Sequence, residues 1–134
     1  MDKNGYAVVS VMNMELTDAM AVHKESVSKN PYSLLSLPPS NTMASSGDVF
    51  KPELYLINTD DGLVYRKEQF ADDNEVFAEY VVADKRYTKA EIESLFVDEE
   101  FTVVESRYVQ AGHWDTPLDA TDAKAKEILL VVRK

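Results

Sequence analysis

The sequence predicts an α/β fold in which the elements follow the order β-α-β, then a β-hairpin or meander excursion, then α-β-β. Three stretches carry this prediction: the apolar run Tyr6–Met12, a capped helix that leads into a strand over residues 86–109, and the apolar run at residues 127–134. Such nearly continuous runs are typical of strands that are buried on both faces of a sheet. With 134 residues, 45 % of them apolar, we expect one domain over residues 1–134.

The composition argues against several classes of function. The chain has 14 Lys and Arg against 24 Asp and Glu, and its net charge of −10 repels phosphate, so we expect no nucleic-acid partner. The absence of cysteine excludes disulfides and thiolate sites. No apolar run approaches the roughly 18 residues of a membrane span, and the N-terminus lacks a signal-peptide layout. We therefore expect a cytoplasmic protein with no membrane partner.

Residues 1–37 are predicted to form a βαβ unit. After the first strand, Thr17 or Asp18 is expected to cap a helix that Asn30, followed by Pro, ends. Residues 32–37 are then expected to form a second strand. A strand, a helix and a strand over some thirty residues predict two parallel strands joined by a right-handed crossover.

Residues 53–82 are predicted to form a β-meander. Two short apolar runs, residues 54–57 and 63–65, flank Asp61 and Gly62, which are a strong hairpin-turn signal. Residues 75–82 continue with alternating apolar positions and are expected to form a third strand. The Pro- and Ser-rich residues 38–52 before this meander are expected to form a long loop, and loops of that length are usually functional or mobile.

The segment 86–134 is predicted to form a helix and two closing strands. Thr88 and Glu91 have the spacing of a capping box, and Tyr87 and Ile92 that of a hydrophobic staple. The expected apolar face of the helix consists of Ile92, Leu95 and Phe96. The strand over residues 101–109, a loop over residues 110–123 and a final strand buried on both faces are expected to follow.

None of the familiar cofactor or metal motifs occurs in the sequence. The four glycines all lie more than six residues apart, so the clustered glycines of a dinucleotide fingerprint or a phosphate loop are absent. His23 and His113 are ninety residues apart without a metal-spaced partner, and no metal is expected. The stretch around His113 and Trp114 is expected either to stack on a ligand or to close the end of the sheet.

The segments RYTKAEIESLFVDEEFTVVESRYVQ and AKEILLVVRK resemble the second half of class I S-adenosylmethionine-dependent methyltransferases. In that family a helix leads into the sixth strand, and an apolar seventh strand, antiparallel to the others, ends the chain. The resemblance implies a partial Rossmann-like, methyltransferase-type mixed sheet with an antiparallel last strand, in which residues 53–82 cover the acceptor pocket. The sequence departs from the family at DEEF, where the family has a glycine before Phe.

The resemblance implies the acceptor-binding half of a small-molecule methyltransferase that is not competent alone. The family's glycine-rich loop belongs to a first half that this sequence does not contain. S-adenosylmethionine is therefore expected only if another chain or a missing segment supplies its site. No catalytic residue is identified. Ligands of open α/β sheets lie beyond the carboxyl ends of the strands. We expect acceptor contacts at these strand ends, on the hairpin and near the tryptophan. The expected residues are Asn13, Glu15, Pro39, Asn41, Tyr55, Tyr65, His113 and Trp114.

Two further interpretations remain open. The chain is an interaction subunit or half of a homodimer without catalytic activity, or it is an unrelated α+β module that binds a small ligand. The first of these rests on Tyr6–Met12, which would be an exposed apolar edge strand without the family's first half and would pair with another chain. The expected partners are thus a small-molecule acceptor or a protein, which is either a second copy or a different chain.

Overall fold

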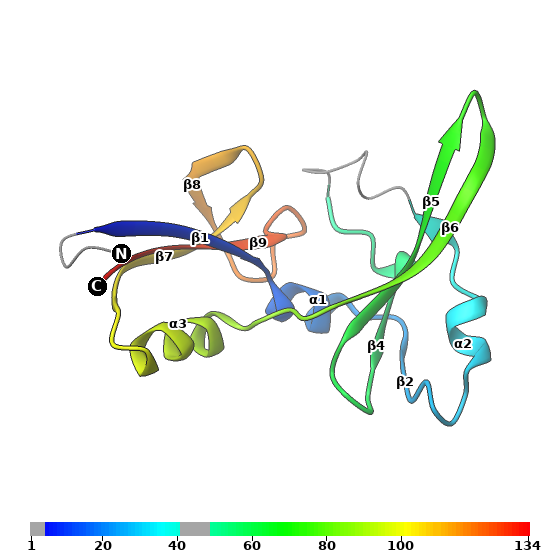
Figure 1. The fold of residues 1–134 in the computed structure, drawn as a ribbon, viewed down its shortest axis with the longest axis horizontal. Coiled ribbons are helices and arrows are strands. Elements are labelled where there is room, and N and C mark those ends of the chain that lie inside the picture. Colours follow the sequence, from blue (N-terminus) through cyan, green and yellow to red (C-terminus); the bar gives the residue numbers. More distant parts are fainter. Residues whose placement is uncertain (1–4, 41–48) are drawn as a thin grey trace. The chain divides into compact units, whose positions relative to one another are not determined.

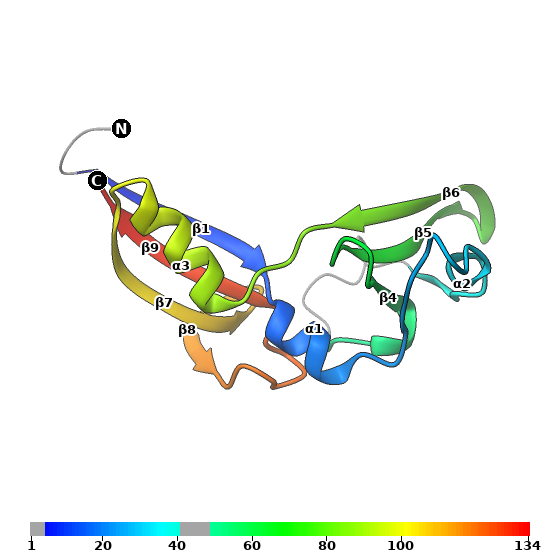
Figure 2. The same ribbon diagram turned by 90° about the horizontal axis from the view of Figure 1, so that it is seen from below.

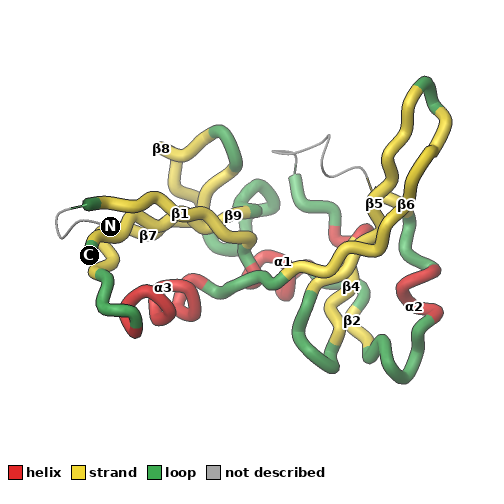
Figure 3. The backbone as a smooth tube through the Cα atoms, in the orientation of Figure 1, coloured by secondary structure: helices red, strands yellow, loops and turns green. Residues whose placement is uncertain are grey.

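The computed structural model describes residues 5–40 and 49–134 (Figures 1 and 3). The chain forms two compact units, each with its own sheet. The first unit contains the described residues up to Ala19 together with Arg86–Lys134, and the second is Met20–Lys85. The expectation of one domain over residues 1–134 stays a prediction.

The first unit is built on a four-stranded sheet in which every pair of neighbours is antiparallel. Its strand order is β1 (Tyr6–Met12), β9 (Glu127–Arg133), β7 (Thr102–Gln110) and β8 (His113–Leu118). The terminal strand β9 therefore lies between β1 and β7, and its predicted antiparallel direction is confirmed.

One helix, α3 (Lys89–Asp98), lies along one face of this sheet, as Figure 2 shows. Ile128, Leu130 and Val132 of β9 point to that face, are fully buried and form a cluster with Ile92 of the helix. Alternate residues of β9 face the other way and are only partly buried. The prediction that this strand is buried on both faces is therefore wrong, because α3 covers only one of them.

The same alternation corrects the prediction for β1. Ala7, Val9 and Val11 pack against the core cluster, whereas Tyr6 and Val8 are exposed on the opposite face. The strand lies at the edge of the sheet and not at its centre. Alternate residues of this apolar run therefore pack into the core, and the residues between them are on the opposite, exposed face of the strand.

The helix α3 begins as predicted. The Thr88 hydroxyl accepts a hydrogen bond from the Glu91 N–H (3.1 Å), and the Glu91 carboxylate accepts one from the Thr88 N–H (3.0 Å), so the capping box is confirmed. Tyr87 and Ile92 both contact the core cluster, as a staple requires. Leu95, predicted on the apolar face, is instead exposed, because the contact with the sheet passes through Ile92 and Phe96.

The helix after β1 is shorter than predicted. α1 spans Met14–Met20 and begins at Asn13, whose side-chain Oδ1 accepts hydrogen bonds from the N–H groups of Glu15 (3.0 Å) and Leu16 (3.4 Å). Thr17 is an interior residue whose hydroxyl donates to the Asn13 carbonyl (3.0 Å). The predicted start at Thr17 or Asp18 and end at Asn30 are therefore wrong.

The predicted second strand is a single helical turn. α2 spans Tyr32–Leu35, and the hydroxyls of Ser33 and Ser36 donate to the carbonyls of Asn30 (2.6 Å) and Ser33 (3.0 Å). Ser33 and Leu37 are buried, and their spacing of four is that of a helix. The βαβ unit over residues 1–37 is therefore wrong, and the Rossmann-like strand order is not confirmed.

The second unit contains the predicted β-meander within a mixed sheet. Gly62 has a φ of +74° in the turn between β4 and β5, as the hairpin requires, and β6 pairs antiparallel with β5. Two very short strands add parallel pairs, β2 to β4 and β3 to β5. The elements of this unit are β2 (Lys24–Glu25), β3 (Pro39–Ser40), the 3-10 helix η1 (Pro52–Leu54), β4 (Tyr55–Asn58), β5 (Val64–Asp72) and β6 (Glu75–Asp84).

The loop predicted over residues 110–123 contains a further strand. β8 (His113–Leu118) folds back on β7 through a two-residue turn, in which Gly112 has a φ of +86°. In the sequence, Gly112 is compatible with a hairpin turn. Pro117, which lies within β8, argues against a strand at the centre of a sheet. This strand lies at an edge of the sheet, where a proline is tolerated.

Candidate functional site

Asn13 and Glu15 lie in the first unit, where both hold the fold together. Asn13 is buried, and its Nδ2 donates to the carbonyls of Ala120 (2.9 Å) and Ala125 (2.8 Å), which ties the segment before β9 to the start of α1. The Glu15 carboxylate accepts a hydrogen bond from the Lys89 N–H (3.1 Å), which connects α1 to the start of α3. The amide and the carboxylate are thus used in internal contacts.

Glu15 also contacts the half-buried Tyr108 of β7. Burial, together with the hydrogen bond to Glu15 and the negative charges of Glu15 and Glu93, raises the pKa of the Tyr108 hydroxyl far above its ordinary value. The ammonium of Lys89 lies 5.4 Å from the centre of the Tyr108 ring. This tyrosine is therefore held as a neutral hydrogen-bond donor, and it connects β7 to both helices of the unit.

The other predicted acceptor contacts are dispersed within their units. In the second unit Pro39 is exposed on β3, Tyr55 is buried and stacks on Phe50 with ring centres 5.0 Å apart, and the Tyr65 hydroxyl donates to Asp61 (3.4 Å). None of those three residues lines the pocket of that unit that is formed by α2, β2 and β4. In the first unit His113 and Trp114 are neighbours on β8, and both are exposed. Asn41 lies outside the described residues.

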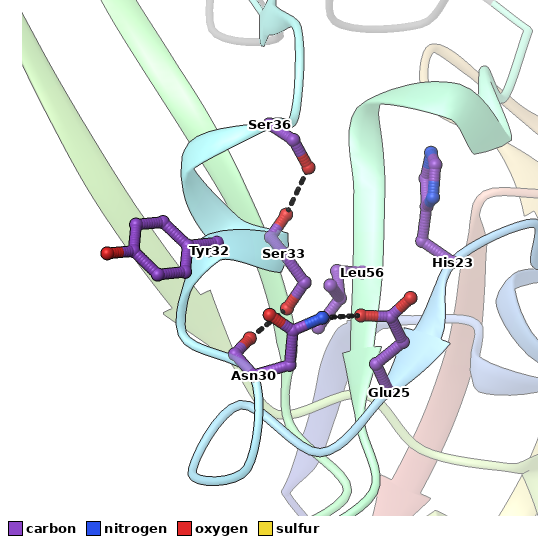
Figure 4. A pocket seen from close by; sticks show the side chains of 7 residues that line it. All are labelled: His23, Glu25, Asn30, Tyr32, Ser33, Ser36 and Leu56. Carbon is purple, nitrogen blue, oxygen red and sulfur yellow. Dashed lines mark hydrogen bonds between the residues drawn. The ribbon is translucent and has the colours of Figure 1, made fainter.

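A pocket of about 220 Å³ lies in the second unit, between α2 and the strands β2 and β4 (Figure 4). The turn before α2 is held by Asp60, whose carboxylate accepts hydrogen bonds from the Ser26 hydroxyl (2.6 Å) and the Ser28 N–H (3.0 Å). These two bonds lower the pKa of Asp60 and hold the turn that presents Asn30. The lining residues are His23, Glu25, Asn30, Tyr32, Ser33, Ser36 and Leu56.

The polar groups of this pocket are largely satisfied by one another. The hydroxyls of Ser33 and Ser36 donate to backbone carbonyls, and the Asn30 amide donates to the Glu25 carboxylate (3.3 Å), as the dashed lines in Figure 4 show. The polar side chains of this pocket that these bonds leave for a ligand are those of His23 and Tyr32, together with the Glu25 carboxylate. No signal in the sequence indicated this site, because the run at residues 32–37 predicted a strand and not the helical turn that forms one wall.

The first unit also has a feature that can bind a partner, which is the free edge of β1. β1 pairs with β9 on one side only, and on its other side the described residues contribute a single bridge between Asn13 and Tyr87. The Tyr87 N–H donates to the Met12 carbonyl (3.1 Å), and the Met14 N–H donates to the Tyr87 carbonyl (2.8 Å). The bridge thus occupies the C-terminal end of this edge, and no other strand among the described residues pairs with the edge at residues 6–11.

No protein-family model, no curated protein and no solved structure matches this chain. Within residues 5–40 and 49–134, no group of three or more His, Asp or Glu residues could hold a metal ion. In the same ranges, no helix is long and apolar enough to cross a membrane. The resemblance of the segment 86–134 to methyltransferases stays a prediction.

Proposed function

We propose that the protein is an interaction module that associates with a second copy of itself through β1. The observation that supports this proposal best is the open edge of β1 at residues 6–11, in a strand that contains neither proline nor a charged residue. Edge strands of monomeric proteins are usually protected by lysine, proline, a bulge or a covering loop. A strand of this composition favours pairing with another strand.

The pattern of β1 is compatible with its own copy. In an antiparallel pair of identical strands, residues directly opposite each other share a face of the sheet. If the pair is centred on Val8, then Val8 lies opposite its counterpart, Ala7 opposite Val9, and Tyr6 opposite Ser10. Core-facing residues then meet core-facing residues, and exposed residues meet exposed residues.

The charge of the protein also favours this strand as the place of contact. Two copies that each carry a net charge of −10 repel one another over most of their surfaces. Residues 6–11 bring no carboxylate into the pairing, so the contact adds no like-charge pair at close range. Pairing would join two four-stranded sheets into one sheet of eight strands.

Light scattering coupled to size-exclusion chromatography tests this proposal. The wild-type protein is expected at about 30 kDa, twice the 15.1 kDa of one chain. Val8→Lys is expected to give the monomer mass, because it places two ammonium groups directly opposite each other at the centre of the pair. The matched control is Val104→Lys, since Val104 is a similarly exposed valine (51 % against 68 % for Val8) on β7, which β9 separates from the β1 edge.

Two outcomes would contradict the proposal. The first is a wild-type protein that stays a monomer at the highest concentration tested. The second is a Val8→Lys variant that dimerises as well as the wild type, since the contact would then lie elsewhere. Circular dichroism of both variants checks that the sheet is intact.

A further inference from the structure

The β5–β6 hairpin of the second unit extends beyond the rest of its sheet (Figure 1). β4 and β3 pair with β5 only up to Glu68. From residue 69 outward, β5 has β6 as its only strand partner among the described residues, and Asp73 and Asn74 form the turn with φ values of 48° and 66°. We call residues 69–80 the arm. A two-stranded arm of this kind has no core of its own.

Three aromatic side chains form a cluster on the arm. The ring of Phe70 lies 6.4 Å from that of Phe77 and 5.9 Å from that of Tyr80, measured between ring centres. The pairing register of β5 and β6 shifts next to Phe70, which indicates a β-bulge. This bulge allows Phe77 to join the cluster. Phe77 is 71 % exposed and Tyr80 58 % exposed. Contacting aromatic rings that stay exposed to this degree indicate a surface for a partner.

The charges of the arm are all of one sign. It carries Asp72, Asp73, Glu75 and Glu79 and contains no lysine or arginine. One of these carboxylates, that of Glu79, accepts a hydrogen bond from the Gln69 side chain across the two strands (2.7 Å). The aromatic cluster therefore lies among four carboxylates, in a stretch where nothing basic neutralises them.

We propose that the arm binds a basic segment of a partner protein, in which Lys or Arg residues alternate with apolar residues. A cation placed over the face of an aromatic ring is attracted by the ring, and the nearby carboxylates add to this attraction. The apolar residues of such a segment would cover Phe77 and Tyr80. A second arm is a poor occupant because it would bring four more carboxylates to the same place. Nucleic acid and anionic membranes are disfavoured for the same electrostatic reason.

This proposal does not depend on self-association through β1, because the arm belongs to the second unit. The Val8→Lys variant is therefore expected to bind the basic segment as well as the wild type does. Loss of dimerisation with retained binding would separate the two surfaces.

Fluorescence anisotropy with a labelled ten-residue peptide of alternating Arg and Val tests the proposal. Phe77→Ala is expected to weaken binding about tenfold, since it removes the most exposed ring of the cluster without changing the charge. Phe77→Tyr, which keeps a ring, is expected to bind as the wild type does. Leu35→Ala is the matched control, because Leu35 is a comparably exposed apolar residue (62 %) of the same unit that lies outside the arm and does not line the pocket.

The same experiment separates this binding from general attraction to an acidic protein. Equal binding by the wild type and Phe77→Ala would overturn the proposal, because the net charge alone would then explain the signal. A stronger loss in Leu35→Ala than in Phe77→Ala would place the site elsewhere and would also overturn it. Binding to phosphatidylserine vesicles in the absence of peptide binding would identify a membrane surface as the partner and contradict the proposed chemistry.

Discussion

Replacing Leu130 or its neighbour Leu129 by alanine tests the one-sided core of the first unit. Leu130 points to α3, is fully buried and packs with Ile92, Ile128 and Val132. Leu129 follows the opposite face of the same strand and is only partly buried. The two substitutions remove the same atoms from adjacent positions, so any difference between them reports on which face is covered.

The expected magnitudes follow from burial. A fully buried leucine changed to alanine costs about 3–5 kcal/mol, because the loss of apolar burial and the cavity add together. A partly buried leucine loses only part of the transfer free energy and leaves no closed cavity, so about 1 kcal/mol is expected for Leu129→Ala. Against a total stability of roughly 5–15 kcal/mol, the first change is severe and the second is mild.

Urea denaturation measures both changes in the free energy of unfolding. Trp114, the only tryptophan, lies on β8 of the same sheet and reports on this unit by fluorescence, while circular dichroism follows the backbone. The measurement is repeated at tenfold higher protein concentration, so that a contribution from dimerisation is recognised. Equal costs for the two variants would refute the reasoning, because the second face would then be as well covered as the first.

Two further predictions concern a buried carboxylate and the cofactor. Burial raises the pKa of Glu127, with Lys126 opposing, and its Oε2 has no hydrogen-bond partner among the described residues. Because the pKa of Glu127 is higher in the folded than in the unfolded protein, the folded protein loses stability as the pH rises from below 4.5 through the folded-state pKa. Glu127→Gln should therefore raise the melting temperature at pH 7 and leave it nearly unchanged at pH 3.5; an equal gain at both pH values would exclude the charge as the cause. Calorimetric titration with S-adenosylmethionine should give no saturable heat, because no two glycines lie close enough to form a cofactor loop; tight binding would contradict this.

Several elements were predictable because their signals are local. The capping box at Thr88 and Glu91 needs only residues that are three apart, and the hairpin turn at Gly62 needs only a residue that tolerates a positive φ. The strands at β1, β6, β7 and β9 were predicted within about two residues of their ends. Of the acceptor contacts predicted from the sequence, Asn13 and Glu15 lie together at the start of α1, where Asn13 holds the segment before β9 and Glu15 holds the start of α3.

Local sequence signals predicted where the chain turns, where α3 begins and which runs are extended, because backbone preference and capping act over a few neighbouring residues. Three-dimensional packing was needed to show which face of β1 and β9 is buried, that residues 32–37 coil into a turn, and that β9 pairs with β1 and β7. The pairing of β1 with β9, for example, joins residues more than a hundred positions apart, such as Tyr6 and Arg133. A short apolar run satisfies a strand or a helix equally well, and the neighbours that it meets decide between them.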